Sequence, residues 1–285
     1  MGTSKGYGGP ANGLVPTWID DVTPGAGAAP ASPENDGQGT GSQIPSTDGP
    51  QAPSPAASPA SQSLGGARGN FTRFVRNGDR AALRRAVSQY VRQGAGGAQG
   101  AARRMGTSRA VGSQLLGVFR DVQRDGATAV LRRINLGALV GRPAADVFIA
   151  LTEVICPPGG RVDEAIARQA MLETIGDLAE TGVGDFGAMS ADEMNEFFIG
   201  FVIHTIEGRV MADLGQRAIE LPTSVADVES IQEQLHDFVD GNVRGHLGHL
   251  LEGLPAISDG DIGKVVDRIY EASFELVSAT AGDVK

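Results

Sequence analysis

Apolar residues recur at helical spacing through most of the chain after residue 65. In residues 79–94 they fall three and four positions apart, at Leu83, Ala86, Val87, Tyr90 and Val91. This spacing places them on one face of a helix, and Asp79 directly before them is of the type that caps a helix N-terminus. No alternating strand pattern of useful length occurs. The sequence therefore predicts an all-α fold, a helical bundle.

Further helices are expected on the same grounds. Pro143 stands where a helix begins, and that helix ends before the Pro/Gly breaker at 157–160. The other expected helices span 161–180, 191–214, about 225–251 and 259–279. A Gly/Ala-rich stretch, 94–126, would let helices approach closely, although each glycine weakens a helix by roughly 1 kcal/mol.

The first 65 residues have a different composition. They hold 10 of the 15 prolines and 12 of the 41 glycines, so these two residue types make up about a third of the segment. Such a segment has too few apolar side chains to offset the entropy lost on ordering, which predicts disorder. We expect a head at 1–21, a disordered Gly/Pro/Ser-rich linker at 22–65 and a helical domain at 66–285.

The net charge of −10 is distributed unevenly. Residues 66–133 carry 14 arginines and three aspartates, whereas residues 134–285 carry nine basic and 26 acidic residues. Nucleic-acid contact through the basic part is one interpretation, and its candidate residues are Arg84, Arg85, Arg103, Arg104 and Arg109. The interpretation we favour is that the two parts neutralise one another within the fold or across an interface, because the basic part has few aromatic residues for base stacking.

Cysteine content and hydropathy indicate where the chain resides. A single cysteine, Cys156, permits no intramolecular disulfide. The N-terminus lacks the pattern of a signal peptide, and no run approaches 18 apolar residues. We expect a cytoplasmic protein without membrane contact.

Two histidine-containing pairs are candidates for chemistry. His246 and His249 are three residues apart and project onto the expected apolar face, which predicts packing rather than metal binding, since His236 points away from them and further ligands are missing. His204 and Glu207 are also three apart, but no nucleophile accompanies them. We expect no metal, no cofactor and no catalytic residue.

Two further features have structural interpretations. Cys156 precedes Pro157 at a helix end, as expected for a structural thiol. Glu164 and Arg168 fall on the apolar face of their helix at the spacing of an ion pair. An internal ion pair is the favoured interpretation, and a contact with a partner or with the basic region is the alternative.

The head itself remains to be explained. Its glycines fail the dinucleotide-binding and myristoylation patterns. Removal of Met1 before the small Gly2 would expose an α-amine that titrates near pH 8, free of side-chain obstruction and on a long tether. The head carries five residues that could dock into a partner: Tyr7, Leu14, Val15, Trp18 and Ile19.

Three stretches resemble the QatB family of the four-gene bacterial Qat anti-phage system. They are the head GTSKGYGGP…LVPTWIDD, the segment FVRNGDRAALRRAVSQYVRQGAGGAQGAARRM and the block CPPGGRVDEAIARQAM. The resemblance covers the head and most of residues 66–240, with a variable linker between them.

The resemblance implies partners and a role. The partners would be an ATPase, a TatD-like nuclease and a QueC-like enzyme related to the synthase of 7-cyano-7-deazaguanine. Such an enzyme activates a deazapurine carboxylate with ATP, and related systems attach a deazaguanine to an N-terminal glycine. The acceptor here would be Gly2, with Thr3, Ser4 and Tyr7 read by the modifying enzyme, and the chain would be a non-enzymatic substrate protein.

Overall fold

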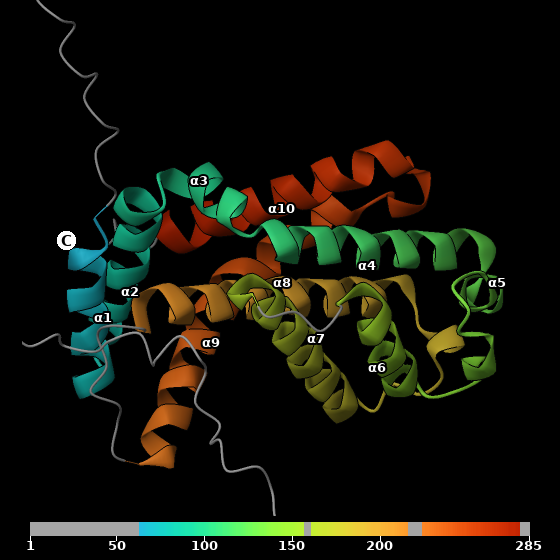
Figure 1. Ribbon diagram of the computed structural model, residues 1–285, viewed down its shortest axis with the longest axis horizontal. Coiled ribbons are helices and arrows are strands. Elements are labelled where there is room, and N and C mark those ends of the chain that lie inside the picture. The colour runs from blue at the N-terminus through green and yellow to red at the C-terminus, as the bar shows by residue number, and fades with distance from the viewer. Residues whose placement is uncertain (1–62, 157–160, 216–223, 280–285) are drawn as a thin grey trace, which may run out of the picture. The chain divides into compact units, whose positions relative to one another are not determined.

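The computed structural model describes residues 63–156, 161–215 and 224–279 (Figure 1). Ten α-helices occur in these ranges: α1 (Gly65–Asn77), α2 (Arg80–Gln89), α3 (Gly97–Arg104), α4 (Gly106–Asp125), α5 (Ala127–Arg133), α6 (Ala144–Ile155), α7 (Val162–Thr181), α8 (Ala191–Gly215), α9 (Val225–Leu247) and α10 (Asp259–Ala279). Within the same ranges there is no strand, only an isolated bridge between Pro143 and Asp185. The all-α prediction is confirmed.

The predicted division of the chain can be compared with the structure only from residue 63 onward. Helix α1 begins at Gly65, one residue before the expected start of the helical domain. The head at 1–21 and nearly all of the linker at 22–65 lie outside the described residues. The described helices belong to one compact unit.

Helix α8 is the central element. Every residue from Phe197 to Ile206 is buried, so this helix is covered on all sides. It packs against α7, α9, α4 and α1, and it runs through the middle of the ribbon in Figure 1. Polar side chains on α8 are therefore held inside the domain rather than on its surface.

Several helix boundaries follow from local chemistry. Asp79 caps α2 as predicted, its carboxylate accepting hydrogen bonds from the backbone N–H groups of Ala81 at 2.9 Å and Ala82 at 3.1 Å. Ser224 caps α9 through the N–H of Asp227 at 3.1 Å. Pro143 stands directly before α6, which ends at Ile155 ahead of the breaker.

The Gly/Ala-rich stretch forms more helix than its glycine content indicated. It follows a π-helical turn, η2 (Tyr90–Gly94), and contains α3 and the 20-residue α4, joined at Met105. Helix α3 packs on α10, and α4 packs on α8 and α10. A methyl group at Gly112 would lie at the ordinary contact distance of 3.5 Å from Phe201 and Val266, so α4 lies close to α8 and α10 at this point.

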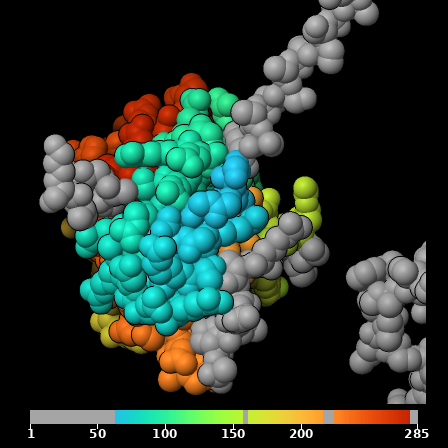
Figure 2. Space-filling view, turned by 90° about the vertical axis from the view of Figure 1, so that its left-hand side faces the viewer, coloured from blue at the N-terminus to red at the C-terminus, as the bar shows by residue number. Residues whose placement is uncertain are grey.

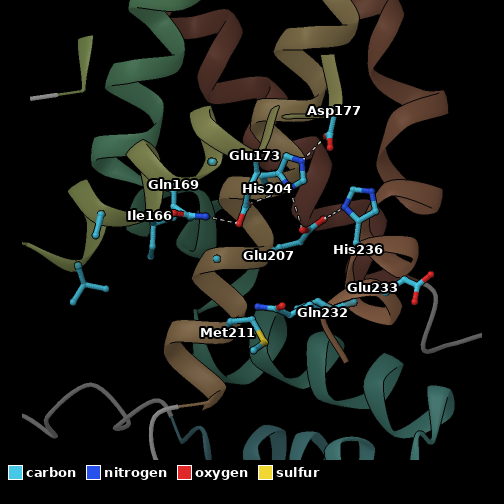
Figure 3. A pocket seen from close by; sticks show the side chains of 15 residues that line it. Ile166, Gln169, Glu173, Asp177, His204, Glu207, Met211, Gln232, Glu233 and His236 are labelled. Carbon is cyan, nitrogen blue, oxygen red and sulfur yellow. Dashed lines mark hydrogen bonds and ion pairs between the residues drawn. The ribbon is translucent and has the colours of Figure 1, made fainter. Parts of the chain in front are cut away.

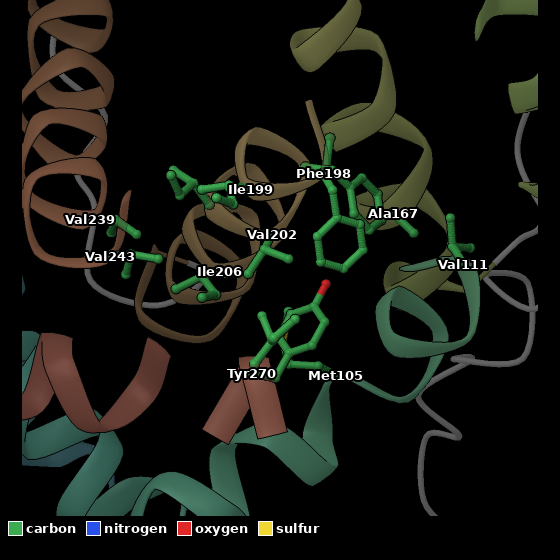
Figure 4. Close-up of a cluster of buried hydrophobic side chains, with 14 of the residues drawn as sticks. Met105, Val111, Ala167, Phe198, Ile199, Val202, Ile206, Val239, Val243 and Tyr270 are labelled. Atoms are coloured by element: carbon green, nitrogen blue, oxygen red, sulfur yellow. The ribbon is translucent and has the colours of Figure 1, made fainter. Parts of the chain in front are cut away.

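The hydrophobic core joins helices from both ends of the sequence. Figure 4 shows Phe198 and Val202 of α8 facing Tyr270 of α10, with Val239 and Val243 of α9 beyond them. The Tyr270 hydroxyl is fully buried, and it shares a hydrogen bond of 2.8 Å with the hydroxyl of Thr205 on α8. This contact is one of the few polar links inside the core.

The view in Figure 2 presents one end of the helical unit. Helices α1 and α2, coloured blue to cyan, form most of this surface, with α9 at its lower edge and α10 at its upper edge. Among the described helices, none combines the length and apolar character needed to cross a bilayer.

Candidate functional site

A cavity of about 720 Å³ lies among α7, α8 and α9 (Figure 3). Its apolar wall includes Ile166 and Met211. Its ionisable side chains come from all three helices: Glu173, Asp177, His204, Glu207, Glu233 and His236. Four carboxylates thus face one hollow that contains two imidazoles.

Helix geometry explains how these groups meet. His204 lies within the buried run of α8, and Glu207 is one turn further along the same face. Glu173 and Asp177 are four residues apart and therefore also share one face of their helix, α7, which packs on α8. His236 follows the buried Leu235 on α9, at the edge of the seam by which α9 packs on α8.

Hydrogen bonds connect the three helices through these side chains. His204 Nε2 lies 2.8 Å from the Asp177 carboxylate and therefore donates to it. His204 Nδ1 lies 3.4 Å from both Glu207 Oε2 and Glu173 Oε2. His236 Nδ1 is 3.0 Å from Glu207 Oε1, and the two imidazoles stack with their centroids 5.2 Å apart.

The pKa values of three side chains in the cluster are shifted. Burial disfavours the charged form of His204, but its hydrogen bonds with Glu207 and Asp177 outweigh burial and raise its pKa to about 9. The hydrogen bond with Glu207 raises the pKa of His236, against the effect of burial. Burial favours protonation of Glu207, yet the two histidines lower its pKa. Without a bound cation, the cluster is an ion-paired network around Glu207.

The predicted packing role of His246 and His249 is wrong, because both side chains are exposed. The buried seam of α9 continues through Val243 to Leu247, and His246 lies about 60° from the first and about 100° from the second around the helix. Helix α9 ends at Leu247, and His249 lies in the 3-10 turn η5 (Gly248–Leu251).

His236, which the sequence places away from His246 and His249, contacts both His204 and Glu207. The sequence signal for the complete cluster was weak: two carboxylates four apart on α7 and a His–Glu pair three apart on α8. These pairs became a single site only through the packing of α7 and α9 on α8, which no spacing within one helix reveals.

The expected ion pair between Glu164 and Arg168 is not formed. Glu164 instead accepts a hydrogen bond from the backbone N–H of Arg161 at 3.3 Å and so caps α7. Arg168 pairs with Glu153 on α6 and donates to the carbonyl of Cys156 at 2.8 Å. Capping of the first turn competes for Glu164, and α6 supplies a better partner for Arg168.

Cys156 is a buried thiol in the described structure. Burial raises its pKa to about 11, partly opposed by Arg168. Burial and the raised pKa both disfavour the reactive thiolate, which is consistent with a structural thiol.

Two of the five arginines proposed for nucleic-acid contact are held by contacts within the domain. Arg109 pairs with Asp267 on α10, and Arg104 donates to the carbonyl of Gly94 at 2.7 Å. The exposed members are Arg84, Arg85 and Arg103, of which Arg85 pairs with Asp79 at 3.4 Å and Arg103 contacts Gln99 at 2.9 Å. Pairs such as Arg109–Asp267 support neutralisation between the basic and acidic parts.

The residues expected to receive a modification or to contact a partner lie outside the described residues. They are Gly2, Thr3, Ser4, Tyr7, Leu14, Val15, Trp18 and Ile19.

The described helices define an α-helical domain with an acidic, histidine-containing cavity between three of them. The sequence model of the Qat anti-phage system associated protein QatB matches residues 96–277, which is more than half of the chain. The chain therefore belongs to the QatB family, and it is a component of an anti-phage defence system. Comparisons with curated proteins and with solved structures gave no significant match.

Proposed function

We propose that this chain is a non-enzymatic protein substrate in its defence system, and that its N-terminal Gly2 is the acceptor. The observation that carries the proposal is the glycine that follows Met1, at the start of a head with Tyr7 and Trp18, in a member of the QatB family. A QueC-like enzyme of the same system is the proposed modifying partner.

The reaction is an amide synthesis. The partner enzyme activates the carboxylate of a 7-deazaguanine with ATP, forming an acyl adenylate and releasing pyrophosphate. The neutral α-amine of Gly2 attacks the acyl carbon, AMP leaves, and the amine loses a proton. Because the amine titrates near pH 8, about a tenth of it is neutral and nucleophilic at pH 7.

The head supplies the recognition surface in this proposal. Thr3, Ser4 and Tyr7 lie next to the acceptor, where the active site of the modifying enzyme would read them. Leu14, Val15, Trp18 and Ile19 would be buried in the partner, which compensates for the entropy of ordering the head. The ATPase and the TatD-like nuclease are the further proposed partners, in the cytoplasm.

Mass spectrometry of the N-terminal peptide tests the proposal. The chain is expressed with the whole system and, separately, without the QueC-like enzyme. We expect Met1 to be absent in both samples and an added deazaguanine mass on Gly2 only in the first. An unmodified Gly2 in cells that resist phage would refute the proposal.

Two matched substitutions make the test specific. Gly2→Ala preserves a small residue after Met1 but adds a methyl group beside the amine, and it should reduce both modification and phage protection. Gly6→Ala changes a glycine of the same head away from the terminus and should preserve both. Full protection by Gly2→Ala without any modification would contradict the proposed role.

Nucleic-acid binding is the second candidate, favoured by the exposure of Arg84, Arg85 and Arg103. It requires salt-sensitive binding to DNA or RNA that weakens when these three arginines are replaced by glutamine. Absence of binding at low salt would eliminate this candidate without affecting the first.

A further inference from the structure

The ionisable groups of the cavity have the arrangement of a metal site. The candidate ligand atoms of His204, Glu207 and His236 all lie within 4.8 Å of one another. Two histidines and one glutamate form a known ligand set for zinc. We propose that these three residues bind one divalent transition-metal ion, with zinc as the reference case.

The spacing of the ligand atoms supports this site. Four ligands placed tetrahedrally at zinc-bond length are about 3.3 Å from one another. The two oxygens of Glu207 each face one imidazole: Oε1 is 3.0 Å from His236 Nδ1, and Oε2 is 3.4 Å from His204 Nδ1. Both imidazoles thus direct their Nδ1 atoms toward one carboxylate, and small side-chain movements would let a cation stand between the three groups.

A second observation concerns Asp177, which is not one of the three proposed ligands. His204 donates its Nε2 hydrogen to Asp177 at 2.8 Å. Metal-bound histidines commonly donate their second ring nitrogen to a carboxylate, which fixes the tautomer and orients the ring. Asp177 thereby holds the ring so that His204 Nδ1 can bind a metal that displaces its proton.

The surroundings supply a fourth ligand and the charge that a cation requires. Glu173 Oε2 is 3.4 Å from His204 Nδ1, and Glu233 also lines the cavity. The ligand residues come from α8 and α9, and Glu173 and Asp177 come from α7, as Figure 3 shows. A bound ion would therefore connect three helices that otherwise meet through packing and hydrogen bonds.

The test measures metal content and thermal stability in the full chain, purified without a histidine tag. Protein treated with a chelator is equilibrated with zinc sulfate at micromolar concentration, and free metal is removed before elemental analysis. We expect one zinc per chain and a rise in melting temperature, because a ligand that binds only the folded state stabilises it.

The exposed histidine pair provides a matched control. His246→Gln with His249→Gln removes two surface imidazoles and should leave the stoichiometry at one. His236→Gln and, separately, Glu207→Gln should weaken zinc affinity at least tenfold. His236 is about one-third exposed, so its replacement should leave the far-ultraviolet circular dichroism spectrum unchanged.

The possible outcomes distinguish a metal site in the cavity from zinc binding at the exposed histidines and from an ion-paired network without metal. Equal zinc binding by the wild type and by His236→Gln would overturn the site, as would loss of zinc only in the double variant at His246 and His249. No retained zinc in the wild type would also overturn it, and would leave the cluster as an ion-paired network. Asp177→Asn should weaken binding less than replacement of a direct ligand.

Discussion

Individual side chains in this domain owe their properties to burial and to partners that are distant in sequence. Cys156 was expected to be inert from its position before Pro157, and its raised pKa gives a physical reason. His204 is different, because spacing alone paired it with Glu207 but gave no hint of Asp177 or His236. Candidate residues could thus be identified from the sequence. The partners that shift their pKa values could not.

Cys156 should react slowly with iodoacetamide. At about pH 8, a pKa of about 11 in place of 9.0 reduces the thiolate fraction about a hundredfold, and burial adds a further barrier. The alkylation rate measured by mass spectrometry should therefore fall by at least that factor relative to protein unfolded in guanidinium chloride. Equal rates in the folded and unfolded states would contradict the buried placement of the thiol.

Asp213 should be among the most sensitive charged residues. Its carboxylate accepts a hydrogen bond from the Tyr90 hydroxyl at 2.9 Å and one from Arg209 at 3.1 Å. Asp213→Ala leaves both donors without this acceptor, so we expect a loss of about 2 kcal/mol in the free energy of unfolding, measured by denaturant titration.

Asp267→Ala is the control for that prediction. It removes the partner of Arg109, but the Asp267 side chain is about half exposed. Exposed ion pairs contribute less than about 1 kcal/mol, so the change should be small. A larger loss for Asp267→Ala than for Asp213→Ala would show that burial does not rank these two carboxylates.

At the scale of the elements, the helices were largely predictable because their signals are local. The cap at Asp79, the stop after Ile155 and the last helix at Asp259–Ala279 all follow from neighbouring residues. The stretch 94–126 was underestimated, since packing of α4 between α8 and α10 compensates for its glycines. Tertiary contact there overrides intrinsic propensity.

The cap of α2 can be tested by a conservative series. Asp79→Ala removes the acceptor for two backbone N–H groups, and we expect it to cost about 1 kcal/mol of unfolding free energy. Asp79→Ser retains a capping oxygen and should recover most of this loss. Identical stabilities for the alanine and serine variants in urea titrations would argue against capping.

Two glycines should respond to alanine in opposite directions. A methyl group at Gly100 would lie 2.1 Å from the carbonyl oxygen of Ala95, so Gly100→Ala should destabilise the protein by about 1–3 kcal/mol. Gly176 lies on the exposed side of α7 with nothing within 4 Å of the added atom. Gly176→Ala should stabilise by about 0.5–1 kcal/mol, because alanine favours the helix.

Thermal melting of the two variants tests whether their stabilities change in opposite directions. We expect a lowered melting temperature for Gly100→Ala and a raised one for Gly176→Ala. This result would attribute the loss of stability at Gly100 to the clash with the carbonyl of Ala95. Stabilisation by both substitutions would mean that α3 can move away from the carbonyl at little cost.

At the scale of the molecule, helix order could be predicted but helix pairing could not. Helix α10 packs against α2, α3 and α4, which precede it by more than 130 residues, and no spacing within a helix encodes such contacts. The cavity is formed by a different set of contacts, the packing of α7 and α9 on α8. Its histidines are consequently identifiable only in the folded domain.

The extent of the folding unit gives the last prediction, which compares two fragments. The buried core of the described residues begins at Ala67 and ends at Val277. A fragment of residues 63–285 keeps all of this core, so its melting temperature should lie within about 2 °C of that of the full chain.

A fragment of residues 96–277 corresponds to the family match but lacks α1 and α2. Those helices supply the fully buried Phe71, Phe74 and Leu83, and loss of one such side chain costs about 2–5 kcal/mol. The shorter fragment should therefore fail to show a cooperative transition by calorimetry. If it melts like the longer one, α1 and α2 are accessory to the domain, and if residues 63–285 do not fold, the first 62 residues contribute to its stability.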